Sequence, residues 1–346
     1  MNRRQFLQNS LLGGLSAAAV AGAGSTFAAA PSASRVSLTA GGDHVDTVFQ
    51  SLKFFARDIS RSIGSRRVVI KPNNVAIDVP LCATPAESIE AILEFLKSIG
   101  KIRNAIIAES AASGPTLEGF ANYGYPRLAA KYGVKLVDLD QDQIEILHVF
   151  NERDFRPHPV RVCRNLLDPG NFIISATRPK THDRVVATLS LKNIIVGAPI
   201  KDAGFRWGKG RREGALNDKP IVHGSGFRGV NYNLFALAPR LHPHLAVIDG
   251  YQGMEGNGPT GGTPVDHRVA VTSLDWLAAD RVAVELMGID FAKVGYLNYC
   301  AQARLGEADL GRIEVLGEPV QRHIKPYQLH RRVEEQLIWM KPARQA

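Results

Sequence analysis

The stretch RVVIKPNN, residues 67–74, is a short run of β-branched apolar residues that ends in a lysine, a proline and two asparagines. Apolar residues without polar alternation are typical of a strand that is buried on both faces of a sheet. Proline and asparagine then favour a loop. The stretch therefore predicts a buried strand that delivers polar side chains at its carboxyl end.

The same pattern of strand, polar loop and helix recurs along the 346 residues. It predicts an α/β fold, with a mostly parallel sheet, helices on both faces and room for a smaller inserted or second subdomain. The first helix has a capping-box pattern at its start, Thr84-Pro85-Ala86-Glu87. The other expected strands occupy residues 105–108, 134–140, 172–175, 245–248 and 313–317, and the expected helices occupy residues 85–100, 117–132 and 275–287.

The first residues have the pattern of a twin-arginine export signal. Arg3 and Arg4 precede Phe6-Leu7, a short apolar stretch and a run of small residues. The apolar stretch is too short and too rich in glycine for a stable membrane span; an amphipathic N-terminal helix is the alternative. We expect the twin-arginine translocation machinery as a partner and a periplasmic or otherwise exported location. The expected divisions are a signal at 1–30, an N-terminal lead-in at 31–65, the α/β domain at 66–318 and a basic, peripheral C-terminal tail at 319–346.

Composition narrows the class of protein. Apolar residues make up 45% and charged residues 22%, which is an ordinary globular balance. The net charge of +9 favours anionic partners, but the basic residues are scattered and form no nucleic-acid motif, so we expect no nucleic-acid partner. Cys82, Cys163 and Cys300 lie far apart without a CxxC pair. We therefore expect no iron–sulfur cluster, since such clusters usually take four cysteines.

Several expected strands end in polar residues, and the carboxyl ends of parallel strands meet at one edge of a sheet, where ligands bind. Lysines there could bind an anion or act as bases, a histidine could carry protons, and carboxylates could carry protons or hold a hard cation. Whether a metal is bound stays open. The candidate catalytic residues are Lys71, Lys180, His182, Lys192, Asp249 and Glu255. The candidate substrate-binding residues are Asn73, Asn74, Glu109, Ser110, Asn193 and Asn257.

Some positions allow two interpretations. Lys192 stands among apolar residues, so it is either a solvated residue on the outer face of a helix or a buried, reactive amine. Asp280 could face the site or solvent. Residues 201–229, rich in Gly, Arg and Lys, predict a long loop or lid, and residues 249–259 predict a loop rich in glycine and carboxylates. The pair His242 and His244 is not expected to bind a metal, because Pro243 separates the two histidines.

The segments around the polar strand ends resemble those of a known family. VIKPN at 69–73, PKTH at 179–182, SLKN at 190–193 and MEGNGP at 254–259 follow one another as in the family called domain of unknown function 362. The resemblance spans residues 66–317. It implies an uncharacterised bacterial and archaeal family, in which some relatives carry a ferredoxin-like segment with cysteine-rich four-iron cluster motifs. This chain lacks those cysteines.

Two functions fit these observations. The first is an enzyme that acts on a small anionic substrate at the carboxyl ends of the strands. The alternative is a non-catalytic protein that binds a ligand or metal, or helps the maturation of another exported protein. A redox partner is a third possibility, which the missing cluster cysteines disfavour.

Overall fold

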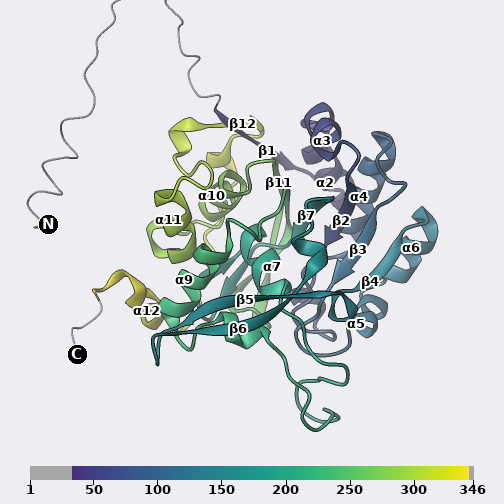
Figure 1. Ribbon diagram of the computed structural model, residues 1–346. Coiled ribbons are helices and arrows are strands. Elements are labelled where there is room, and N and C mark those ends of the chain that lie inside the picture. Colours follow the sequence, from purple (N-terminus) through teal and green to yellow (C-terminus); the bar gives the residue numbers. More distant parts are fainter. Residues whose placement is uncertain (1–32, 343–346) are drawn as a thin grey trace, which may run out of the picture. The chain divides into compact units, whose positions relative to one another are not determined.

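The computed structural model describes residues 33–342 (Figure 1). The expected export signal, with Arg3 and Arg4, lies outside the described residues. Within residues 33–342, no helix has both the length and the apolar composition that a membrane crossing requires.

The centre of the fold is one large, mostly parallel sheet, as predicted. Strands β10, β7, β2, β3 and β4 run parallel, β11 is antiparallel to its neighbours β10 and β1, and β1 pairs in parallel with β12. Two short strands, β8 (Lys180–His182) and β9 (Val186–Thr188), extend from β10. The main strands in spatial order are β12 (Ile313–Gly317), β1 (Ser34–Ala40), β11 (Gly261–Ser273), β10 (Leu245–Asn257), β7 (Asn171–Thr177), β2 (Arg67–Lys71), β3 (Ile106–Glu109) and β4 (Lys135–Asp138).

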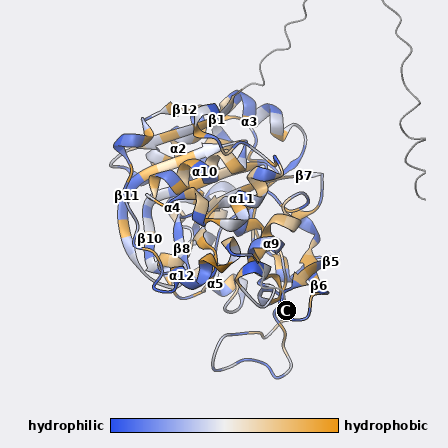
Figure 2. Cartoon of the chain, turned by 90° about the vertical axis from the view of Figure 1, so that its left-hand side faces the viewer, coloured by the Kyte–Doolittle hydropathy of each residue, from blue (hydrophilic) through white to orange (hydrophobic). Residues whose placement is uncertain are grey.

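Helices cover both faces of this sheet, because alternate residues of each buried strand point to opposite sides. Val68 and Ile70 of β2 belong to one apolar core and Val69 to the other. The helices on the first face are α2 (His44–Lys53), α3 (Ala56–Ile63), α4 (Ala86–Ser98), α5 (Thr116–Asn122) and α6 (Tyr125–Tyr132). Those on the second face are α7 (Ser190–Gly197), α9 (Phe227–Leu237), α10 (Trp276–Leu286) and α11 (Gly295–Gln302). Figure 2 shows hydrophobic residues, in orange, along α10.

A two-stranded antiparallel sheet lies apart from the large one. It consists of β5 (Ile144–Asn151) and β6 (Arg156–Cys163), and the sequence analysis expected neither strand. Val149 and Val160 bury their side chains in the same core as α7 and α9. The hairpin is therefore an addition on the second face of the sheet, next to the helices that position the site.

Two details of the expected helices are wrong. The expected capping box does not form, since the N-cap of α4 is Pro85 and carries no side-chain cap. The Thr84 hydroxyl instead donates to the Ala176 carbonyl at 2.7 Å and accepts from Asn73 N at 2.8 Å, so it fixes the loop after β2. The helix expected at 117–132 is divided into α5 and α6 at Gly124, whose φ of +75° interrupts the helix.

Regular structure also forms in the N-terminal lead-in, for which no element was predicted, and in one segment that was expected to be a loop. Before residue 66, β1 and the helices α2 and α3 form, and β1 lies inside the sheet between β12 and β11. The loop expected at 249–259 is mostly strand: β10 continues to Asn257 and pairs with β11. The two long strands form a ladder in which Glu255 lies opposite Thr263. The glycines of this segment therefore belong to a hairpin.

Candidate functional site

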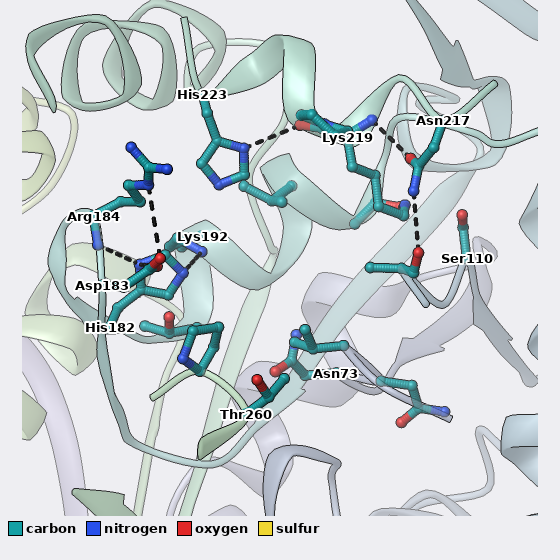
Figure 3. Close-up of a pocket in the computed structure, with 18 of the residues that line it drawn as sticks. Asn73, Ser110, His182, Asp183, Arg184, Lys192, Asn217, Lys219, His223 and Thr260 are labelled. Carbon is teal, nitrogen blue, oxygen red and sulfur yellow. Dashed lines mark hydrogen bonds and ion pairs between the residues drawn. The ribbon is translucent and has the colours of Figure 1, made fainter. Parts of the chain in front are cut away.

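A cavity of about 510 Å³ lies at the carboxyl ends of β2 and β3 (Figure 3). From β2, the chain continues on one side to β3 and β4, and later strands β7 and β10 lie on the other side. Ligands of such sheets bind where the strand order reverses in this way. The loops after β2 and β3, the segment from β8 to α7 and residues 207–226 form the walls.

Lys71 is a fixed positive charge at the base of this cavity. It ends β2, and its fully buried Nζ donates to Glu109 Oε1 at 2.8 Å, Asn193 Oδ1 at 3.0 Å and the Pro72 carbonyl at 3.0 Å. These three oxygens match the three hydrogens of an ammonium group. Gly197 makes room for Lys71, because a Cβ at this position would overlap its Cε and Nζ.

Glu109, the partner of Lys71, holds two loops together. Its Oε1 also accepts from Ser110 N at 2.8 Å, and its Oε2 accepts from Asn74 N at 3.0 Å. The Ser110 hydroxyl donates to Asp140 Oδ1 at 2.5 Å. Glu109 and Ser110 line the cavity, but the protein already engages these polar atoms. Their contacts indicate a positioning role for both residues.

Lys180 and Asn193 lie next to the cavity without lining it. Asn73 joins them, because its Nδ2 donates to Asn193 Oδ1 at 3.0 Å and its Oδ1 accepts from Lys180 Nζ. Lys180 Nζ also donates to the Cys82 carbonyl at 2.6 Å. Burial, the largest cause, lowers the pKa of Lys180 to about 8. The structure thus connects Lys71 to Lys180 through two asparagine side chains.

Lys192 faces the cavity and is only 5% exposed. Of the two interpretations of this residue, the solvated outer-face position is therefore wrong. Its Nζ lies 3.0 Å from His182 Nε2, and Figure 3 shows the two side chains meeting at the cavity wall. Burial and then the charge of Lys180 lower the pKa of Lys192 to about 7. Lys192 is thus an amine that can lose its proton near neutral pH.

The surroundings of His182 assign its proton. His182 Nδ1 accepts from Arg184 N at 3.0 Å, so a neutral ring carries its hydrogen on Nε2, which faces Lys192. Burial, the charge of Lys192 and His223 all hold the pKa of His182 well below its usual range. Asp183 Oδ1 lies 3.2 Å from Nδ1 and is the nearest negative charge to the ring. The side chains of Asp183, His182 and Lys192 therefore follow one another toward the cavity.

Lys219 and His223 are among the cavity residues that the sequence analysis missed, together with Arg153, Asp183, Arg184 and Thr188. Lys219 and His223 belong to the segment expected as a loop, where a short helix forms, α8 (Lys219–Val222). Lys219 Nζ donates to the carbonyls of Gly197, at 3.2 Å, and Pro199, and burial lowers its pKa to about 8. The His223 ring is stacked near His182 with centroids 6.5 Å apart. The four-residue spacing of Lys219 and His223 on one helix face was the signal that could have identified them.

Two residues that line the cavity each have a buried polar group without a hydrogen-bond partner in the described part of the chain. These groups are the amide Nδ2 of Asn74 and the hydroxyl of Thr188, and each residue is 2% exposed. A buried polar group without a partner costs about 1–3 kcal/mol. Arg153 and Arg184 add positive charge to the wall. The cavity therefore has hydrogen-bonding capacity and positive charge for an anion.

Three candidates lie away from the cavity. Asp249 accepts from His44 Nε2 at 2.8 Å and from Tyr251 N at 3.0 Å. Glu255 accepts from Gln328 N at 2.8 Å. Asn257 is at the end of β10, and none of the three lines the cavity. The reason is that β10 continues past the sheet edge as a hairpin, which places its polar residues against other segments.

Two buried side chains outside the cavity position its residues. Asp280, expected to face the site or solvent, is fully buried and accepts from Ser190 N at 2.8 Å and Leu191 N at 3.1 Å, so it caps the start of α7. In the C-terminal segment, α12 (Val333–Gln336) ends with a fully buried Gln336, which donates to the His182 carbonyl at 2.9 Å. Both side chains thus hold the segment from His182 to α7.

Across residues 33–342, no cluster of three or more His, Cys, Asp or Glu side chains could hold an ion. Cys82, Cys163 and Cys300 are buried free thiols. His242 and His244 bond to backbone groups, through the Ala238 carbonyl at 2.8 Å and Ile173 N at 3.0 Å.

Comparisons with known proteins agree with the resemblance seen in the sequence. A family model described as "Domain of unknown function (DUF362)" matches residues 68–285. A thylakoid-associated protein of Synechocystis sp. is 24% identical over 243 residues, which are 69% of this chain and 68% of that protein. No solved structure matches the chain.

Proposed function

This chain belongs to the DUF362 family of proteins of unknown function, and we propose that it is an enzyme that acts on a small anionic molecule bound in the cavity. In this proposal, Lys192 is the reactive amine and the Nε2–H of His182 is a hydrogen-bond donor to the reacting group. The contact between Lys192 Nζ and His182 Nε2 carries the proposal, because it places an amine and a donor together on the wall of a cavity.

The charges of the cavity support an anionic ligand. Lys71, Lys219, Arg153 and Arg184 all line it. The carboxylates on the wall are Glu109, which Lys71 neutralises, and Asp183. A positive excess in a concave, partly desolvated site attracts anions more strongly than the same charges on an open surface.

A non-catalytic ligand-binding protein is the second candidate. The free amide of Asn74 and the free hydroxyl of Thr188 favour it, since both groups would be satisfied by a bound molecule without any reaction. The contact between Lys192 and His182 favours the enzyme, because ligand binding alone does not require an amine that loses its proton near pH 7.

Calorimetry with a panel of small anions tests the proposal. We expect at least one of oxalate, phosphate and pyruvate to bind to the full chain. The Lys192→Met variant should bind that anion at least about 10-fold more weakly, which corresponds to the loss of one charge-assisted hydrogen bond. Lys209→Met is the matched control, because Lys209 is exposed and outside the cavity wall. Absence of any anion binding, or equal binding by Lys192→Met, would contradict the proposal.

We also propose that the protein works after export by the twin-arginine route, on the strength of Arg3 and Arg4 before Phe6-Leu7. Changing both arginines to lysine keeps the charge, and we expect the precursor to stay in the cytoplasm. Cell fractionation with an antibody against the chain measures this. Normal export of the double variant would show that another route is used.

A further inference from the structure

We propose that Lys192 forms an imine with the carbonyl carbon of a small anionic carbonyl compound, one that bears a carboxylate or a phosphate. This inference rests on the proposed function, because it identifies the substrate class of the same cavity. It goes further by assigning a covalent step to one atom, Lys192 Nζ.

The contacts of Lys192 differ from those of the other buried lysines around the cavity. Lys71, Lys180 and Lys219 each donate to two or three oxygens, which hold them as ammonium groups or as donors. Within residues 33–342, the hydrogen-bonding partner of Lys192 Nζ is a nitrogen, His182 Nε2. Lys192 therefore lacks the oxygen acceptors that keep an ammonium group protonated.

The hydrogen on His182 makes the amine neutral in this arrangement. Because Nδ1 accepts from Arg184 N, the hydrogen of a neutral ring lies on Nε2 and points at Lys192 Nζ. A nitrogen that accepts this hydrogen must offer a lone pair, and an ammonium group has none. The geometry thus indicates a free amine, which is the form of lysine that attacks carbonyl carbons.

Burial supports the same conclusion. Desolvation, followed by the charge of Lys180, lowers the pKa of Lys192 to about 7, whereas Asp183 acts in the opposite direction. An exposed lysine has a pKa near 10.4 and is almost entirely protonated at pH 7. With a pKa of about 7, against about 8 for Lys219, Lys192 has a larger neutral fraction than Lys219 at neutral pH.

The rest of the cavity suits an anion that carries a carbonyl group. Its volume of about 510 Å³ admits a small molecule. The unpartnered Asn74 amide is a hydrogen-bond donor, and the unpartnered Thr188 hydroxyl can donate or accept, so both can serve a carboxylate or phosphate oxygen. Lys219 and Arg153 add positive charge to the same wall.

The reaction balances with the groups present. The lone pair of Lys192 Nζ attacks the carbonyl carbon, the N–C bond forms, and the C=O π electrons move to oxygen. Two protons then pass from Nζ to that oxygen. Solvent relays both protons, and the Nε2–H of His182 donates a hydrogen bond to the developing oxyanion, so the ring stays neutral throughout. The C–O bond breaks, water leaves, and the nitrogen lone pair completes the C=N bond.

Reductive trapping tests the imine. The full chain is incubated near pH 7.5 with pyruvate or with glycolaldehyde phosphate, and sodium cyanoborohydride reduces any imine to a stable secondary amine. Propanal, which is neutral, serves as the comparison compound. Peptide mass spectrometry should locate one adduct on Lys192 with an anionic compound, and much less of it with propanal. The carboxylate and phosphate arms distinguish the two anionic groups.

Variants make the test specific to the site. Lys192→Met should give no adduct, and Lys209→Met should behave as the wild type. His182→Phe keeps a ring and removes the Nε2 donor, so adduct formation should be about 10²-fold slower or more. Thr188→Val should decrease adduct formation with the anionic compound and leave adduct formation with propanal unchanged.

Three results would overturn the inference. An adduct spread over exposed lysines, or retained in Lys192→Met, would exclude Lys192 as the nucleophile. Anion binding by calorimetry without any trapped adduct would leave the proposed function in place and refute the imine. Absence of both binding and adduct would refute the proposed function as well.

Discussion

Replacing Gly197 by alanine is expected to lower the free energy of unfolding by about 3–5 kcal/mol. Gly197 is the last residue of α7, and a Cβ there would occupy the space of Lys71 Cε and Nζ. Lys71 would have to leave Glu109, and the buried Glu109 carboxylate would lose its charge partner. The better helix propensity of alanine returns at most about 1 kcal/mol, which is too little to offset this loss.

Urea unfolding of the wild type and the Gly197→Ala variant measures the effect. Gly42→Ala is the control, because a Cβ at Gly42 would meet no atom within 4 Å. That variant should stay within about 0.5 kcal/mol of the wild type. If Gly197→Ala were as stable as the wild type, Lys71 would not be held in place by the end of α7.

The strand ends are the part of the site that the sequence could predict. Lys71 and Glu109 end apolar runs, and two parallel strands necessarily bring such residues to one edge. Asp249 also directly follows an expected strand, but β10 continues far beyond it as a hairpin. Its carboxylate pairs with His44, from a segment in which the sequence showed no element. The residues of a strand do not reveal which distant segments of the chain it will contact.

Local patterns failed where tertiary contacts competed for the same group. Thr84 has the sequence of a helix cap, but its hydroxyl fixes the loop after β2 instead. The sequence around Lys192 fits a position on the outer or the inner face of a helix. Only the packing of α7 decides that the side chain points into the cavity. Lys219 and His223 lay in a segment rich in glycine and charge, where a four-residue helix gives a weak signal.

Replacing Lys192 by methionine is expected to stabilise the fold more at pH 7 than at pH 9, by a difference of about 2 kcal/mol. The pKa of this amine falls from 10.5 to about 7 on folding. Between pH 10.5 and pH 7, Lys192 binds a proton in the unfolded chain but is mostly neutral in the folded chain. The amine therefore destabilises the fold increasingly as the pH decreases toward 7. Below pH 7, the penalty is constant. It amounts to about 2 kcal/mol at pH 9 and about 4 kcal/mol at pH 7.

The pH difference is the informative quantity, because other consequences of the substitution do not oppose it. His182 loses the acceptor of its Nε2 hydrogen, which costs about 1–3 kcal/mol at both pH values. The pKa values of His182 and His223, the latter about 3, lie below this pH range. Lys180, with a pKa of about 8, loses a positive neighbour, and this relief is also larger at lower pH. The attraction between Asp183 and Lys192 already contributes to the pKa of Lys192.

Urea unfolding of the wild type, Lys192→Met and Lys209→Met at pH 7 and pH 9 measures this prediction. The control lysine is exposed, so its variant should show no pH-dependent difference from the wild type. An equal change at both pH values would mean that Lys192 keeps its proton in the folded chain. A pH-dependent gain in stability, together with the loss of anion binding and adduct formation, would show that the buried amine lowers the stability of the fold and is needed for its function.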